Sequence, residues 1–187
     1  MSVNIQKIAL RKHLLEKRDE ISAELRDILS ENIHQNLKHI SSYTDSQKIA
    51  CYFPIGSEVD TYDIMQDILK QNKCLLLPKV VNHNLVFYNV PNFEKLEKGN
   101  FGIMEPKDSC KKADRIDCVL IPTVGVSKMG IRIGYGKGYY DKFLSSTDAV
   151  KISLTYSKQI IKIIPSDSHD IKMNWVVTED EYIKIHN

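Results

Sequence analysis

Two short apolar runs constrain the fold of this 187-residue chain more than any other feature. The runs are KCLLLP (73–78) and DCVLIP (117–122), and neither alternates between apolar and polar residues. Strands that are apolar on both faces must be covered on both faces, as they are in parallel sheets of α/β proteins. The chain therefore requires a central sheet with helical layers on its two sides.

A strand, helix, strand order supports the same architecture. Three further runs rich in β-forming residues predict strands, namely KIACYFP (48–54), LVFYNV (85–90) and AVKISLTY (149–156). Between the first of these and KCLLLP lies DTYDIMQDILKQN (60–72), whose apolar residues recur at helical spacing. This predicts a βαβ unit and an α/β three-layer sandwich with a mostly parallel central sheet. We expect the segment 91–113 to be a surface loop.

The first forty residues show helical periodicity and predict two N-terminal helices. Lys7 and Arg11 stand four residues apart in the first of them, so both cations lie on one helix face. Periodicity alone favours a solvated face for this pair.

Length, charge and cysteine usage exclude several classes of protein. A chain of this length predicts one domain, residues 1–187. Lys and Arg total 26 against 24 acidic residues, and a net charge of +2 provides no broad field for nucleic acid. No apolar run is long enough for a signal or a membrane span, so we expect a cytoplasmic protein without a membrane partner. The four cysteines lack C-x-x-C spacing and the histidines are scattered, which predicts reduced thiols and no transition metal.

The stretch GIRIGYGKGYYDKFLSS (130–146) combines three closely spaced glycines with basic and aromatic residues. It fits neither a P-loop nor a dinucleotide fingerprint, because the glycine spacing and the residues that follow are wrong for both. What remains is an anion nest of backbone N–H groups with charge from Arg132 and Lys137. Asp141, at the start of a predicted helix, is either a helix cap or a magnesium ligand. Tyr139 and Tyr140 either fill the core or stack on an aromatic ligand.

The run RIGYGKGYYD (132–141) resembles the signature of the 5-formyltetrahydrofolate cyclo-ligases, also called 5,10-methenyltetrahydrofolate synthetases. The likeness extends to the K-x-x-x-R pair of the first helix, to FPIGSEVDT (53–61), to DCVLIPTVGVSKMGIRIGYGKGYYDKFL (117–144) and to HDIKMN (169–174). It spans nearly the whole chain.

The resemblance implies an enzyme that uses ATP to cyclise 5-formyltetrahydrofolate to 5,10-methenyltetrahydrofolate, releasing ADP and phosphate. The formyl oxygen would be phosphorylated and then displaced by N10. Lys137 and Arg132 would be catalytic. The implied ATP-binding residues are Lys7, Arg11, Arg132, Ile133, Gly134, Tyr135, Gly136, Lys137, Gly138, Tyr139 and Tyr140. The implied folate-binding residues are Phe53, Glu58, Tyr135, Gly136, Lys137, Gly138, Tyr139 and Tyr140. Mg²⁺ would be held by Asp141 and Asp170.

One departure from the family pattern and four open points accompany this interpretation. Asn174 stands where many relatives carry an aspartate, which bears on the metal or loop contact expected there. A small-molecule kinase or ligase with another acceptor is one alternative, and a non-catalytic nucleotide sensor or RNA-binding module is another, which the near-neutral charge disfavours. The sequence also leaves open monomer or homodimer, and whether the folate is polyglutamylated.

Overall fold

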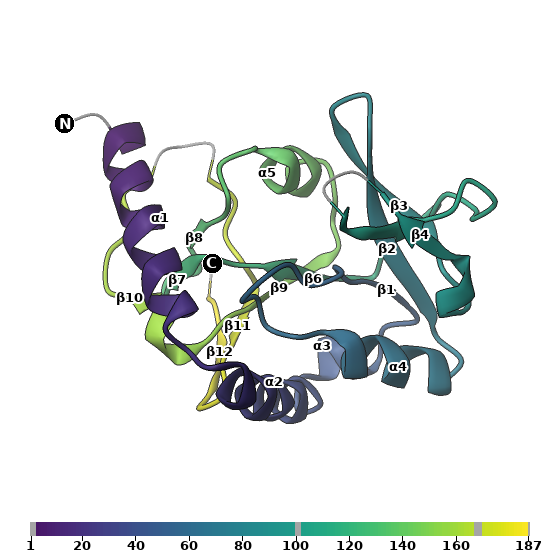
Figure 1. Cartoon of the computed structure of the whole chain (residues 1–187), viewed down its shortest axis with the longest axis horizontal. Coiled ribbons are helices and arrows are strands. Elements are labelled where there is room, and N and C mark those ends of the chain that lie inside the picture. The colour runs from purple at the N-terminus through teal and green to yellow at the C-terminus, as the bar shows by residue number, and fades with distance from the viewer. Residues whose placement is uncertain (1–2, 100–101, 167–169, 187) are drawn as a thin grey trace.

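The computed structural model describes residues 3–99, 102–166 and 170–186 (Figure 1). Its helices are α1 (Val3–Asp19), α2 (Ala23–Leu37), α3 (Ser41–Thr44), α4 (Tyr62–Lys70) and α5 (Tyr139–Leu144), with 3-10 turns η1 (Phe93–Lys95) and η3 (Ser157–Gln159). Its strands are β1 (Lys48–Ala50), β2 (Cys74–Val81), β3 (Asn84–Asn89), β4 (Leu96–Lys98), β5 (Met104–Pro106), β6 (Cys118–Pro122), β7 (Gly125–Ser127), β8 (Arg132–Ile133), β9 (Val150–Leu154), β10 (Ile160–Ile161), β11 (Trp175–Val177) and β12 (Tyr182–Lys184).

The main sheet of the described residues has seven strands in the order β12-β11-β9-β6-β1-β2-β3. Neighbouring strands from β11 to β2 are parallel, and only the edge strands β12 and β3 pair antiparallel. The predicted βαβ unit is β1, α4 and β2. The mostly parallel α/β sheet and the two N-terminal helices, α1 and α2, are therefore confirmed.

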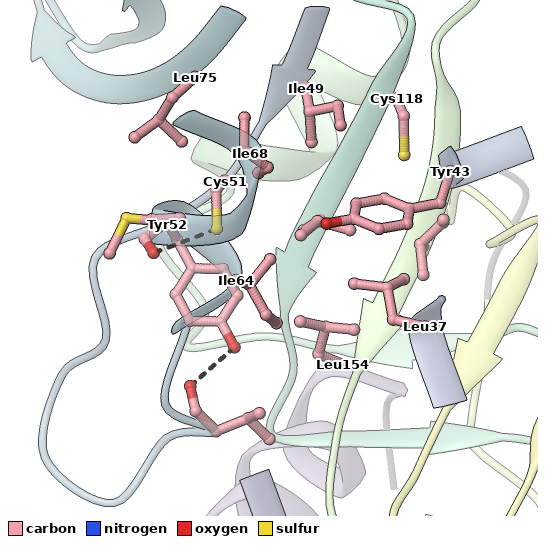
Figure 2. Packing of buried hydrophobic residues seen from close by; sticks show 14 of the residues in the cluster. Leu37, Tyr43, Ile49, Cys51, Tyr52, Ile64, Ile68, Leu75, Cys118 and Leu154 are labelled. Atoms are coloured by element: carbon pink, nitrogen blue, oxygen red, sulfur yellow. Dashed lines mark hydrogen bonds between the residues drawn. The ribbon is translucent and has the colours of Figure 1, made fainter. Parts of the chain in front are cut away.

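Helices cover the sheet on both faces (Figure 1). Leu75 and Leu77 of β2 face α2, α3 and α4, whereas Leu76 between them packs in the cluster that includes Leu144 of α5. Figure 2 shows part of the first cluster, in which Ile64 and Ile68 of α4 lie against the sheet. The apolar runs do not alternate because every residue of these strand centres is buried, on one side or the other.

Helix α1 lies apart from these layers, against a small sheet of order β10-β7-β8 (Figure 1). Leu14 of α1 packs with Val124, Ile133 and Ile164. A Cβ at Gly125 of β7 would lie 2.5 Å from Leu14 Cδ1, so only glycine permits this close approach. The contact sets α1 beside the segment that follows β8.

One loop follows β1 at the carboxyl end of the main sheet, and a second loop follows β8 of the small sheet. The 51–61 loop joins β1 to α4, and the glycine loop (134–138) joins β8 to α5. Strands β1 and β6 are parallel neighbours, so the segments that follow them leave from the same edge of the sheet. Open α/β sheets bind their ligands at this edge.

The first predicted strand is shorter than expected, because β1 ends at Ala50 rather than at Pro54. Cys51 and Tyr52 remain buried but begin the 51–61 loop. The Tyr52 hydroxyl donates to the Val59 carbonyl at 3.1 Å (Figure 2), and the Thr61 hydroxyl donates to the Tyr52 carbonyl at 2.7 Å. These bonds join the beginning of the loop to its end.

The segment 91–113 is not the simple surface loop that was predicted. It contains the antiparallel pair β4 and β5, and it buries Leu96 and Cys110 against the main core. Pairs this short carry too weak a periodic signal to be found in the sequence.

All four cysteines are free, as predicted. Within the described residues, no helix is both long and apolar enough to cross a membrane. The cytoplasmic location stays a prediction.

Candidate functional site

One face of α1 carries three cations, of which Arg11 and Arg18 contact the glycine loop and Lys7 contacts Asp170. Lys7, Arg11 and Arg18 are spaced by four and seven residues, with Leu14 between the two arginines, so helical periodicity places all four on one side. Because Leu14 is anchored on the small sheet, the cations of this face are directed to the adjoining loops. The solvated face that periodicity favoured for Lys7 and Arg11 is therefore wrong.

Arg11 binds the backbone of the glycine loop. Its Nε donates to the Gly134 carbonyl at 2.7 Å. Gly136 has a φ of 87°, a conformation that side chains rarely adopt, and a Cβ there would lie 3.0 Å from Arg11 Cζ. Glycine at this position thus serves both the turn and the approach of the guanidinium.

Arg132 and Asp141 form a partly buried ion pair across the glycine loop. The Arg132 guanidinium donates to Asp141 Oδ1 at 2.7 Å, and its side chain is 4% exposed against 51% for the aspartate. Arg132 Cζ also lies 5.8 Å from the centre of the Tyr140 ring. Arg132 Nε is buried without a hydrogen-bond partner in the described structure.

The capping hypothesis for Asp141 is wrong. The residue at the N-cap of α5 is Gly138, with a φ of 73°, and no side chain caps this helix end. Asp141 instead presents its carboxylate to Arg132 from the first turn of α5.

Lys7 and Asp170 form the second ion pair of the site. Lys7 Nζ donates to both carboxylate oxygens of Asp170 at 2.7 Å. The two residues are 163 positions apart in sequence, so tertiary folding brings this pair together. The preceding histidine of the HDIKMN run, His169, lies outside the described residues.

Glu58 is the buried acid of the 51–61 loop, with 6% of its surface exposed. The Ile55 backbone N–H donates to Glu58 Oε2 at 2.8 Å. Burial raises the pKa of Glu58, while the Ile55 amide, the Tyr135 hydroxyl and the Arg18 guanidinium act in the opposite direction and favour its charged form. Because the Glu58 carboxylate has already lost most of its hydration on folding, it can accept hydrogen bonds from a ligand with little further desolvation cost.

Arg18 is a site residue that the sequence reasoning missed. It is 3% exposed, and its guanidinium donates from Nε to Ser57 Oγ at 2.9 Å and from NH2 to the Tyr135 hydroxyl at 2.8 Å. It thereby joins the 51–61 loop to the glycine loop. Its spacing of seven residues from Arg11 could have identified it, because two helical turns return to the same face.

The other predicted residues divide between surface and core. Lys137 is exposed on the glycine loop, and Tyr139 and Tyr140 are half-buried at the start of α5. Phe53 packs against the main core cluster. The side chain of Ile133 is buried beside Leu14, so any contact of this residue with a nucleotide would come from its backbone.

The carboxylates present fit magnesium held jointly with phosphate. Within the described residues, no group of three or more His, Cys, Asp or Glu side chains could hold a metal ion. Mg²⁺ usually needs only one or two protein carboxylates, because substrate phosphates and water complete its octahedron. Asp141 is half-exposed and presents only Oδ1 to Arg132, so its other oxygen suits this role.

Asn174 has a structural position that accounts for the neutral amide. Its side-chain oxygen accepts the Lys151 backbone N–H at 2.8 Å, and its own backbone N–H donates to the Lys151 carbonyl at 2.8 Å. Asn174 therefore extends the pairing of β11 with β9. An aspartate oxygen could accept the same bond, so the amide keeps the contact with Lys151 that an aspartate would make here.

Two surface hollows lie away from the predicted residues. One, of about 320 Å³, is lined by the side chains of α2 and of the segment 60–63, and the other, of about 730 Å³, lies beside α3 and the start of β9. None of their lining residues is a predicted site residue. The candidate site is instead a surface formed by α1, the glycine loop and the 51–61 loop.

The chain matches the 5-formyltetrahydrofolate cyclo-ligase family over residues 3–179. It is 29% identical to the mouse 5-formyltetrahydrofolate cyclo-ligase, covering 96% of this chain and 97% of that protein. It is 32% identical to the enzyme of the same name from Mycoplasma genitalium, covering 92% and 98%.

Solved structures agree with this. The NMR structure of Aquifex aeolicus 5,10-methenyltetrahydrofolate synthetase superposes with a TM-score of 0.88 at 37% identity, covering 97% of this chain and 93% of that one. The synthetase from Mycoplasma pneumoniae gives a TM-score of 0.75 at 29% identity, covering 92% and 98%. The chain therefore belongs to the 5-formyltetrahydrofolate cyclo-ligase family and has the ligase activity for which that family is named.

Proposed function

We propose that the whole chain, as a single domain of residues 1–187, uses ATP to convert 5-formyltetrahydrofolate to 5,10-methenyltetrahydrofolate. The formyl oxygen attacks the γ-phosphorus of ATP and ADP leaves, N10 then adds to the activated formyl carbon and releases its proton to solvent, and phosphate leaves with the formyl oxygen. The observation that carries the proposal is the convergence of α1, the glycine loop and the 51–61 loop on one surface, which joins a cationic side to a buried acid.

The cationic side supports phosphoryl transfer. Lys7, Arg11, Arg132 and Lys137 surround the triphosphate and neutralise the charge that develops on the transferred group, with Arg132 and Lys137 nearest the γ-phosphate. Backbone N–H groups of Ile133 and of the glycine loop add fixed donors of the kind that bind phosphate. Lys7 is already paired with Asp170, and Arg132 with Asp141. Nucleotide binding therefore exchanges these carboxylate partners for phosphate oxygens.

The acid side supports folate binding. Glu58 accepts hydrogen bonds from the pterin, whose flat ring lies against Tyr140 and the neighbouring Tyr139. Phe53 completes the apolar wall from the core side. The glycine loop lies between nucleotide and folate, so its residues contact both, as positioning of the two reactants requires.

Asp141 and Asp170 would hold Mg²⁺, which would supply charge neutralisation for the triphosphate. Their present partners, Arg132 and Lys7, would then be available to phosphate. The protein itself contributes the acidic and basic side chains that meet at this one surface.

The test is to mix the purified protein with Mg·ATP and 5-formyltetrahydrofolate and follow the near-ultraviolet band of the methenyl product. Lys137→Ala should lower turnover by roughly 100-fold, since it removes a cation that acts on the reacting phosphate. Lys142→Ala is the matched control, because Lys142 is an exposed lysine of α5. ATP turnover without methenyl product, or a fully active Lys137→Ala protein, would contradict the assignment.

A further inference from the structure

Arg18 and Glu58 have an unusual property in common. Each is more than nine-tenths buried, and each has one buried polar atom without a hydrogen-bond partner among the described residues: NH1 of Arg18 and Oε1 of Glu58. No carboxylate of the described residues lies within salt-bridge distance of Arg18. Buried polar atoms are nearly always satisfied, so two unsatisfied atoms of opposite character at one site point to a ligand that supplies both partners.

Tyr135 lies between these two groups. Its hydroxyl accepts the NH2 donor of Arg18 at 2.8 Å, and the Arg18 Cζ is 5.7 Å from its ring centre. The same hydroxyl is close enough to Glu58 to stabilise the charged carboxylate. Tyr135 is 42% exposed and stands between Gly134 and Gly136, where the backbone is free to turn it outward. A phenol thus occupies the space between a buried donor and a buried acceptor.

The chemistry of the pair defines what fits between them. A guanidinium N–H and a carboxylate oxygen that both approach Tyr135 complement an acceptor and a donor, and a lactam carries such a pair as a ring carbonyl next to a ring N–H. The pterin of a reduced folate carries one lactam edge. Charge-assisted bonds of this kind are shorter and stronger than neutral ones.

We propose that Arg18 and Glu58 together bind the lactam edge of the pterin, with Arg18 NH1 donating to the ring carbonyl and Glu58 Oε1 accepting from the adjacent ring N–H. The Tyr135 phenol moves outward as the pterin enters. This rests on the proposed function, because it takes a folate as the substrate. It assigns to Arg18 the recognition of the carbonyl and so makes it a specificity-determining residue.

The test compares 5-formyltetrahydrofolate with its 4-amino analogue, in which an amino group replaces the carbonyl. Calorimetric titration measures binding of both to the wild type, to Arg18→Gln and to the control Lys12→Gln, whose side chain is 81% exposed on the same helix. The wild type and the control should prefer the 4-oxo compound by at least roughly tenfold, since the analogue leaves a buried charged donor unpaired. In Arg18→Gln the preference should fall by at least about threefold from the wild-type value, because only the contact of Glu58 with the ring N–H, which the analogue also lacks, then distinguishes the two compounds, and the KM for ATP should not change.

Arg18→Gln that retains the wild-type preference would overturn the proposal. Because Arg18 is buried, its substitution can impair folding, so the wild type alone also tests the proposal. Equal affinity of the wild type for the two compounds would overturn the proposal. These outcomes are separate from failure of the proposed function. A wild type that forms no methenyl product with Mg·ATP fails that proposal whatever its preference between the two compounds.

Discussion

The two sides of the candidate site treat charge in opposite ways. On the nucleotide side, Lys7 and Arg132 are each 2.7 Å from an aspartate, Asp170 and Asp141, in partly exposed ion pairs. On the folate side, Arg18 and Glu58 are buried and contact neutral groups instead of an ion-pair partner, and each keeps an unsatisfied atom, as Arg132 Nε also does.

The difference reflects what each side has to bind. A triphosphate with magnesium brings both anions and a cation, so a site of ion pairs can exchange partners while its net charge changes little. A flat neutral heterocycle brings single donors and acceptors, and it is recognised by groups that were desolvated when the protein folded. We therefore expect substitutions on the two sides to differ in kind as well as in size.

The largest effect should come from Arg132→Gln on the nucleotide side. It removes a buried cation that contacts both Asp141 and the Tyr140 ring, so kcat should fall by roughly 100-fold to 1000-fold. Steady-state kinetics of methenyl formation, with thermal unfolding as a check on the fold, would measure it. A folded variant within about threefold of the wild-type rate would remove Arg132 from the reaction.

Asp141→Asn should have the next largest effect. The amide can still accept from Arg132 but lacks the charge that a hard cation requires, so activity should fall by roughly 10-fold to 100-fold while thermal stability barely changes. Raising the magnesium concentration should restore part of the rate. Ordinary activity with ordinary magnesium dependence would leave Asp170 as the sole candidate ligand.

Glu58→Gln should act on the folate side alone. The KM for 5-formyltetrahydrofolate should rise by about tenfold, because the amide loses the charge that strengthens its hydrogen bonds, whereas the KM for ATP should not change. Asp60→Asn, in the exposed part of the same loop, is the matched control. An equal rise in the KM for both substrates would show that Glu58 does not belong to a separate folate side.

Glu58 also makes a prediction about pH. Burial raises its pKa above 4.5, so on acidification it takes up a proton before an exposed glutamate does, and the KM for folate should rise in that range. Between 4.5 and the raised pKa the folded state binds more protons than the unfolded state, so the free energy of unfolding falls as pH rises. Both dependences should disappear in Glu58→Gln, as kinetics and denaturant titration across this range would measure.

The smallest effect should be that of Asn174→Asp. Its side-chain oxygen accepts a backbone N–H of β9, and a carboxylate can do the same, so activity and stability should change little. Asn174→Ala, which removes the acceptor, should lower the free energy of unfolding by about 1 kcal/mol. Loss of magnesium dependence in Asn174→Asp would show instead that this position belongs to the nucleotide side.

Sequence reasoning was strongest where local pattern and burial agree. The unbroken apolar runs predicted strands covered on both faces, and β2 and β6 have that environment. The spacing within α4 and the order of β1, α4 and β2 predicted the parallel connection. It was weakest for β4 and β5, whose pairing depends on distant packing of Leu96 and Cys110.

The sequence by itself determined the sheet, its helical cover and the basic, glycine-rich character of one loop, because these follow from side-chain periodicity and backbone freedom, which are local. Only the tertiary structure decided which charges meet. The pairing of Lys7 with Asp170, the reach of Arg18 to two loops and the burial of Glu58 depend on α1 approaching β7 at Gly125. Local sequence does not specify contacts between residues 39 to 163 positions apart, since these form only when the apolar face of α1 packs on the small sheet.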